Sequence, residues 1–436
     1  MKILQIPYSF YPDPVGETEI YVAALIRKLR EKDIESVIAA PGSCSMGYYH
    51  KETRVRRFLA ENGKSEVAVR EFTHIFKDEQ PDIVHLHALR GITFPMLEEI
   101  KRKKIPLIFT YHAPEASCER GTLLYWGKDV CDGALKVNRC SRCVLHGRGM
   151  GRLTSHLTGG LPSFFGRLLG KLGLSGGIWT ALRMTELMKI RHQNFRLLLN
   201  QADHIIATAV WARDLLIRNG VPEEKITLSR QGLCYEHPDP GPEPSEHKIV
   251  NQGPLKMVFL GRMNPAIGLH VLIKALELKP KLDVTLDVYA NIQEEDIGYQ
   301  SALHSLIKED RRIAFHHPLS EDRILSTLGL FDVVAVPSQS VETGPLVVSD
   351  AFAAGVPVIG SNLGGISELV QNGVNGILVK RESVKDWSEA IRHLQDDRNF
   401  LAQLKNNARF PRSMQDIAEE MKSIYLRYSQ TALSLS

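Results

Sequence analysis

The amino-acid sequence predicts an α/β protein with two Rossmann-like, doubly wound parallel sheets. Short apolar runs typical of buried strands alternate with helical segments from residue 2 to about residue 232, apart from an interruption at 118–200. The same alternation starts again at residue 255 and continues to about residue 410. Because strands that alternate with helices pair side by side in the same direction, this pattern indicates parallel sheets.

In the first domain, strands are predicted where apolar residues run together between polar or turn residues. They lie at 2–7, 36–40, 82–87, 106–112 and 204–208. Amphipathic helices are predicted between them, from about residue 18 and at 66–79, 93–104 and 209–219. In the second domain, strands are predicted at 256–262, 284–290, 313–317, 331–336, 358–359 and 376–379, with a helix at about 265–278.

The domain boundaries follow from local composition. Residues 236–254 are rich in Pro, Gly and acidic residues and show no periodicity, which is typical of an interdomain linker. We therefore expect a first domain at 1–235 with an insertion at about 118–200, and a second domain at 255–410. Phe410 and Pro411 break the chain before a last helical segment within 411–436.

Composition excludes several classes of protein. The 436 residues are 43% apolar and 24% charged, as in ordinary globular proteins. A formal net charge of +4 is too small to indicate nucleic-acid binding. No apolar run reaches the roughly 18 residues of a membrane span, and the first strand, ended by Pro7, is too short for a signal peptide. We therefore expect a cytoplasmic protein that binds no nucleic acid.

The stretch from 336 to 365 carries the most informative pattern. A buried strand at 331–336 is followed by a loop that contains Glu342, and Gly344-Pro345 then begins a helix that runs through Asp350. Free N–H groups at a helix start can hold an anion, and ligands of parallel sheets bind beyond the carboxyl ends of the strands. The pattern therefore predicts an anion site at this sheet edge, unless the unit is a plain strand–helix–strand with solvated acids.

This stretch resembles the donor-site signature of the family-four glycosyltransferases: a Glu, seven residues, a second acid and then Ala-x-Ala-x-Gly-x-Pro-Val. The resemblance implies the GT-B architecture, in which two Rossmann-like domains face each other across a cleft and the last helix crosses back to the first domain. It also implies transfer of a sugar from a UDP- or GDP-linked donor to an acceptor, with retention of the anomeric configuration. No Asp-x-Asp pair adjoins the stretch, which fits a transferase without a catalytic metal ion.

The resemblance also assigns roles to individual residues. The implied catalytic residues are Glu342, beside the anomeric carbon, and His112 of Thr110-Tyr111-His112, beside the donor sugar. The implied donor-binding residues are Gly16, Arg262, Gly344, Pro345, Leu346 and Asp350. Arg262 can clamp a diphosphate and Asp350 can accept from the ribose hydroxyls. His85 and His87 are interpreted as strand or acceptor-side residues.

Three positions depart from the family pattern. Glu17 stands in place of a Gly, Ile267 in place of a Lys and Asp350 in place of a Glu. The first two make the diphosphate site less positive. Two alternatives therefore stand beside the active transferase: a catalytically weakened relative that binds a glycan or a partner transferase, and a nucleotide-sugar epimerase on the same fold.

The interruption at 118–200 carries two further patterns. Four cysteines in one short window predict a structural zinc site, with buried free thiols as the alternative. They are Cys118, Cys131, Cys140 and Cys143. Residues 144–200 then hold eight basic residues and one acid, Glu186, interleaved with apolar groups. This composition predicts either peripheral contact with an anionic inner membrane surface or packing on the parent domain, and it suggests a glycan or lipid-linked acceptor.

Overall fold

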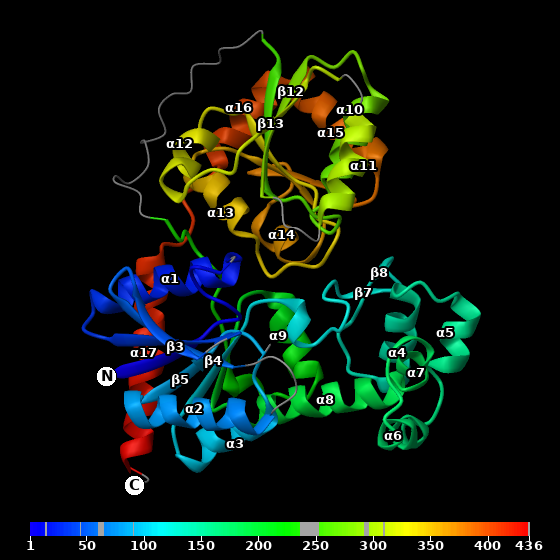
Figure 1. Cartoon of the computed structure of the whole chain (residues 1–436). Helices are drawn as coiled ribbons and strands as arrows, with labels where there is room; N and C mark the ends of the chain where they lie inside the picture. The colour runs from blue at the N-terminus through cyan, green and yellow to red at the C-terminus, as the bar shows by residue number, and fades with distance from the viewer. Residues whose placement is uncertain are drawn as a thin grey trace. The chain divides into compact units, whose positions relative to one another are not determined.

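The computed structural model describes residues 1–13, 15–43, 45–59, 65–89, 91–235, 253–291, 296–307 and 310–434. Residues 236–252 of the predicted linker lie outside these ranges. The chain divides into two compact units (Figure 1). Unit 1 comprises Met1–Arg230 with Gln415–Ser436, and unit 2 comprises Gln231–Met414. No helix in the described ranges is long and apolar enough to span a bilayer.

The described residues of unit 1 form an eight-stranded sheet in the order β10-β9-β6-β5-β1-β2-β4-β3. All pairings are parallel except that of β3 with β4. The strands are β1 (Lys2–Ile6), β2 (Glu35–Gly42), β3 (Met46–His50), β4 (Thr53–Leu59), β5 (Ile83–Leu86), β6 (Leu107–Tyr111), β9 (His204–Ala207) and β10 (Ile226–Leu228). The strand order reverses direction between β1 and β5, which makes this edge the topological switch point of the sheet.

Strands β5, β6 and β9 are buried along their whole length, as expected for parallel strands covered on both faces. The covering helices are α1 (Glu17–Arg30), α2 (Ser65–Glu79), α3 (Phe94–Arg102) and α9 (Val210–Arg218). The last helix of the chain, α17 (Met414–Ser434), also belongs to unit 1. Its Tyr425 is fully buried against His85 of β5, and its Glu420 accepts a hydrogen bond from Ser229 (2.6 Å).

The interruption at 118–200 contains a small antiparallel pair and a group of helices. The elements are β7 (Leu124–Tyr125), β8 (Asp129–Val130), α4 (Val137–Gly147), α5 (Arg152–Thr158), α6 (Ser163–Lys171), α7 (Gly177–Leu182) and α8 (Met184–Gln201). Figure 1 shows α4 to α7 gathered around one end of the long helix α8. A small buried cluster of Val144, Leu145, Met184 and Met188 holds α4 against α8.

The described residues of unit 2 form a fully parallel sheet in the order β13-β12-β11-β14-β15-β16. The strands are β11 (Leu255–Arg262), β12 (Val284–Asn291), β13 (Ile313–His316), β14 (Val333–Val336), β15 (Val358–Ser361) and β16 (Gly376–Val379). This is the strand order of a Rossmann sheet, with its switch point between β11 and β14. The predicted fold class, α/β with two doubly wound parallel sheets, is thereby confirmed.

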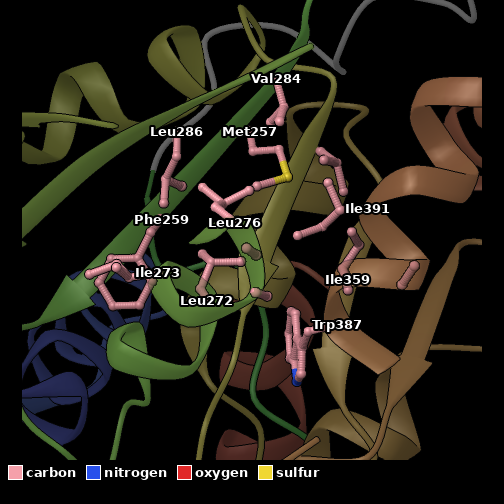
Figure 2. Close-up of a cluster of buried hydrophobic side chains, with 14 of the residues drawn as sticks. Met257, Phe259, Leu272, Ile273, Leu276, Val284, Leu286, Ile359, Trp387 and Ile391 are labelled. Atoms are coloured by element: carbon pink, nitrogen blue, oxygen red, sulfur yellow. The ribbon is translucent and has the colours of Figure 1, made fainter. Parts of the chain in front are cut away.

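Helices cover both faces of this sheet. They are α10 (Leu269–Leu278), α11 (Ile297–Ile307), α12 (Ile324–Leu328), α13 (Leu346–Ala353), α14 (Gly364–Leu369), α15 (Val384–Asp396) and α16 (Arg398–Asn407). Met257 and Phe259 of β11 point toward α10 and α15, where Trp387 fills the core (Figure 2). Val258, between them in sequence, points to the other face and packs with Val348 of α13. The alternation places the carboxyl ends of the strands between two packed layers.

Helix α10 begins at Leu269, four residues later than the predicted start at 265. The reason lies in Gly268, which has a φ of +86° and ends the preceding loop in the left-handed conformation. A Cβ at this position would lie 1.9 Å from the carbonyl oxygen of Pro337. The loop after β11 is therefore pressed against the loop after β14.

Candidate active site

The first group of predicted site residues lies at the switch point of unit 2. Arg262 is the last residue of β11 and is exposed, and the loop that holds Glu342 follows the neighbouring strand β14. The two strands run parallel, with Met257 opposite Val333 and Val258 opposite Val334. Their carboxyl ends therefore meet at one edge, where a Rossmann sheet binds its ligand.

Glu342 is held by contacts at both its backbone and its side chain. Its carbonyl accepts a hydrogen bond from the N–H of Gly365 (2.7 Å), and the hydroxyl of buried Ser338 donates to its carboxylate. The side chain is half-buried. These contacts restrain the carboxylate without enclosing it, so it keeps a side that is open to solvent.

The Gly364-Gly365 pair at the start of α14 allows this close approach. A Cβ on Gly364 would lie 2.8 Å from the Glu342 carbonyl oxygen, and one on Gly365 would lie 2.4 Å from backbone atoms of Thr343. No larger residue fits without moving the loop. The two glycines therefore do more than form a turn, because they allow the backbone of the Glu342 loop to lie directly against the start of α14.

Helix α13 follows the Glu342 loop directly. Pro345 occupies the N-cap position and Leu346 is the first helical residue, so the helix begins one residue later than predicted. The first turn of any helix presents N–H groups that lack an intrahelical acceptor. Asp350 lies farther along the helix and is only 3% exposed, so its carboxylate is buried.

Ile267 lies in the loop between β11 and α10, five residues after Arg262. Its side chain is half-buried and packs against the core of unit 2. Nearby His270 shares hydrogen bonds with the Tyr299 hydroxyl (2.8 and 3.1 Å), and burial, helped by the charge of Lys274, lowers the pKa of His270. His270 is therefore neutral at pH 7 and does not replace the missing lysine.

The second group of predicted site residues lies in unit 1. Gly16 is the N-cap of α1, and its N–H donates to the carboxylate of Glu19 (2.8 Å). Its φ of −109° is open to any residue, so the backbone conformation does not require a glycine here. A Cβ would lie 3.3 Å from the Glu19 carboxylate, so the reason for a glycine here is the limited space beside that carboxylate.

His112 follows β6 and belongs to a buried chain of polar groups at the carboxyl ends of β1, β5 and β6. Its Nε2 lies 2.9 Å from Nδ1 of His87, and Nε2 of His87 lies 2.8 Å from the amide oxygen of Gln5. The Gln5 amide nitrogen donates to the hydroxyl of Tyr425 (3.4 Å). All four side chains are nearly or fully buried.

This chain of contacts determines the proton positions on the two histidines. Burial lowers the pKa of His112 to about 3, and burial, with a smaller effect of the neighbouring rings of His85 and His112, holds the pKa of His87 well below its usual range. Both rings are therefore neutral at pH 7. Because the Gln5 oxygen accepts from Nε2–H of His87, Nδ1 of His87 must accept from Nε2–H of His112. His112 then keeps its lone pair on Nδ1.

The structure does not support the predicted zinc site. Among the described residues, no group of three or more His, Cys, Asp or Glu side chains is placed to hold a metal ion. The thiol of Cys143 donates to the carbonyl of Leu124 (3.6 Å), and the sulfur of Cys131 accepts from Arg139 (3.5 Å). Burial raises the pKa of Cys140 to about 11, which favours the neutral thiol. Cys118 is likewise a free thiol.

A cavity of about 500 Å³ lies elsewhere in unit 1, between β3, β4 and α2. Its lining includes Arg54, Arg56 and Arg57 but none of the predicted site residues. Arg54 is paired with Glu79 (3.1 Å), and Arg56 is paired with Glu79 (2.9 Å) and Asp78 (2.8 Å), so their charges are already compensated. We assign no function to this cavity.

The structure thus groups Arg262, Glu342 and the start of α13 in unit 2, and Gly16 and His112 at the strand ends of unit 1. The buried chain that joins His112 to His87, Gln5 and Tyr425 was not predicted from the sequence. His87 and His112 each end a predicted strand, and this shared position could have indicated that the two side chains lie close together. These two Rossmann sheets define an α/β protein of the doubly wound class, in which ligands bind beyond the carboxyl ends of the strands.

Comparisons with known proteins identify the family. The model for "Glycosyl transferases group 1" matches residues 243–410, and that for "Glycosyltransferase Family 4" matches residues 18–156. The chain belongs to the family-four glycosyltransferases, which have the GT-B fold.

Individual relatives agree with this assignment. The D-inositol 3-phosphate glycosyltransferase of Rhodococcus jostii (strain RHA1) is 28% identical over 230 residues, which is 50% of each chain. The match thus spans about half the length of the curated relatives. Anabaena HepE, solved in complex with UDP-glucose, superposes with a TM-score of 0.63 at 17% identity, covering 100% of both chains. Sucrose-phosphate synthase from Thermosynechococcus elongatus gives a TM-score of 0.64 at 16% identity, covering 100% of this chain and 98% of that one.

Proposed function

We propose that this protein transfers a sugar from a nucleoside-diphosphate sugar, most simply a UDP-linked one, to a glycan or lipid-linked acceptor. Transfer proceeds with retention of the anomeric configuration and without a catalytic metal ion. The observation that carries the proposal is the convergence of Arg262, Glu342 and the start of α13 on the switch point of unit 2. The UDP and UDP-glucose complexes of the similar HepE support the choice of donor.

Each group has a chemical task in this proposal. The guanidinium of Arg262 and the N–H groups at the start of α13 stabilise the negative charge that grows on the departing diphosphate. Glu342 binds sugar hydroxyls beside the anomeric carbon, and Asp350 accepts from the ribose. His112 accepts from a donor-sugar hydroxyl through Nδ1. The acceptor oxygen bonds to the anomeric carbon as the bond to phosphate breaks, and the departing phosphate takes the acceptor proton.

Donor hydrolysis tests the proposal before the acceptor is known. The protein is incubated with UDP-glucose and other nucleotide sugars, with and without a chelator, and the released sugar is followed by NMR. We expect free nucleotide and a sugar that first appears with the donor's anomeric configuration, at a rate the chelator does not change. Inverted sugar would contradict retention. Epimerised donor without release would indicate an epimerase, and binding without any conversion would indicate a weakened relative.

The substitution Ile267→Lys should tighten UDP binding. Because Ile267 is half-buried at the loop after β11, the lysine stem can keep the apolar packing while its ammonium reaches solvent near the strand end. One added charge-assisted contact is worth about 1.5–3 kcal/mol, or roughly 10- to 150-fold in affinity. Calorimetry with UDP on both proteins measures the change. Unchanged or weaker binding would mean that another cation already meets the diphosphate.

His87 should act as a positioning residue for His112. His87→Phe keeps a buried ring but removes the acceptor for Nε2–H of His112, so turnover should fall by about tenfold, the value of one lost hydrogen bond. His87→Asn places an amide oxygen near the former Nδ1 and should restore most of the loss. The donor KM and the pH profile are compared for all three proteins. Wild-type turnover in His87→Phe, or a larger loss in His87→Asn than in His87→Phe, would show that His87 serves packing alone.

A further inference from the structure

The short helices of the 118–200 insertion expose large apolar side chains that a helix normally buries. In α6, the buried residues are Gly166 and Leu169, while Phe164, Leu168 and Leu172 just beyond its end are 69%, 54% and 65% exposed. A helix that packs on its own protein normally turns its large apolar side chains inward. Here most of the large side chains face solvent.

Glycines explain how α6 is attached. A Cβ on Gly166 would lie 2.9 Å from the Cβ of Glu186, and one on Gly170 would lie 2.7 Å from the guanidinium of Arg183. The glycine face of α6 is therefore seated closely on the start of α8. Phe164 and Leu168 consequently point away from the unit, because they lie on the opposite side of the helix.

Helices α5 and α7 repeat this arrangement. In α5, Ser155 is buried while Leu153 and Leu157, one turn apart, are exposed. Helix α7 has no buried residue, and its Ile178 and Trp179 are exposed. All three helices lie together at one end of α8 (Figure 1). We call the exposed side chains of these helices the apolar-basic patch; its apolar members are Leu153, Leu157, Phe164, Leu168, Leu172, Ile178 and Trp179.

The patch carries cations but no acids. Residues 147–182 contain Arg148, Arg152, Arg167 and Lys171 and not one Asp or Glu. Arg152, Arg167 and Lys171 are exposed, and no described residue forms an ion pair with them. The nearest acid in sequence, Glu186, is bound to Arg183 (3.0 Å). Exposed Phe, Leu and Trp side chains interleaved with uncompensated cations form the surface that an anionic bilayer attracts.

We propose that the apolar-basic patch docks this protein on an anionic lipid surface. A second copy of the chain is a poorer occupant, because a symmetric dimer would set the same cations against each other. A bilayer satisfies both components at once: acyl chains receive the apolar side chains, and headgroup phosphates meet Arg152, Arg167 and Lys171. This inference stands apart from the proposed transferase activity, since it uses none of the donor-site residues.

Vesicle co-sedimentation of the full chain tests the proposal without any donor or turnover. The probes are vesicles of equal parts phosphatidylglycerol and phosphatidylcholine, and vesicles of phosphatidylcholine alone. We expect binding to the anionic vesicles that weakens as salt rises. The double substitution R167Q/K171Q should weaken binding roughly 25-fold, at about fivefold per cation. The double substitution F164S/L168S should weaken it by at least about tenfold.

Matched control variants distinguish binding through the patch from nonspecific adsorption to the vesicles. L278S/L330S removes two apolar side chains of unit 2 that are similarly exposed, and K101Q/K103Q removes two exposed cations of unit 1 outside the patch. Both controls should bind as the wild type does, and all variants should keep its melting temperature. Equal binding to neutral vesicles, no binding to anionic ones, or equal losses in the controls would overturn the proposal. So would a vesicle-independent dimer that F164S/L168S converts to a monomer.

Discussion

Replacing Arg262 with alanine is expected to lower the rate of donor cleavage by about 10²-fold or more. Arg262 is exposed at the carboxyl end of β11, whose neighbour β14 leads into the loop that holds Glu342, and in the proposed function its guanidinium meets the diphosphate. Removing one preorganised group that stabilises developing negative charge typically costs this factor. Glu342→Gln should cause a loss of similar size, since it removes the charge while keeping the shape. Release of UDP from UDP-glucose under saturating donor measures both.

The control for this experiment is Arg311→Ala, which removes another exposed arginine of unit 2 that lies outside the candidate site. That variant should retain wild-type turnover. Circular dichroism and the melting temperature should be unchanged in all three variants, because Arg262 and Arg311 are exposed and the amide oxygen introduced by Glu342→Gln can still accept the hydrogen bond from Ser338. Near-normal turnover in both Arg262→Ala and Glu342→Gln would contradict the assignment of the donor site.

Gly268→Ala should destabilise unit 2 more than an ordinary loop substitution does. A left-handed conformation costs an alanine about 1–2 kcal/mol, and a Cβ 1.9 Å from the Pro337 carbonyl oxygen forces the two loops apart. Overpacking of this kind adds about 1–3 kcal/mol, for a total of about 2–5 kcal/mol. The free energy of unfolding from denaturant titration measures the loss. UDP affinity should fall as well, since both loops border the candidate site.

Gly355→Ala is the matched control for this prediction. Gly355 also has a positive φ, of +70°, and lies in unit 2, but a Cβ there would meet no atom within 4 Å. The control should therefore lose only the conformational part, about 1–2 kcal/mol, and should keep UDP affinity. If the free energy of unfolding fell by the same amount in both variants, the close contact between the loops would contribute nothing to stability.

The donor-site elements could be predicted from the sequence because their signals are local. The apolar run of β14, the glycine after α13 and the second strand β15 stand within one short stretch, and each fixes its own conformation. The fold class follows from the repetition of such units. Strand β4 could not be predicted in this way. It carries Arg54, Arg56 and Arg57, which is not the pattern of a buried strand. It becomes a strand of the sheet through its pairing with β2.

Long-range contacts could not be predicted in the same way. Gln5, His87, His112 and Tyr425 meet because three parallel strands end together and the last helix returns to unit 1. The strand-end positions of His87 and His112 indicate that one pair, but nothing in the local sequence indicates Gln5 or Tyr425. The zinc prediction failed for the same reason, since spacing along the chain does not show that Cys143 turns its thiol to a backbone carbonyl.

Calorimetric titration of a panel of nucleotide sugars into the wild-type protein and Arg262→Ala tests the central claim most directly. The claim is that unit 2 binds the diphosphate of a sugar nucleotide at the carboxyl ends of β11 and β14. We predict saturable binding of at least one UDP-linked sugar to the wild type, and binding to Arg262→Ala that is weaker by roughly tenfold or more, as loss of a charge-assisted contact requires. Binding of no nucleotide sugar to the wild type, or equal affinity in the two proteins, would contradict it.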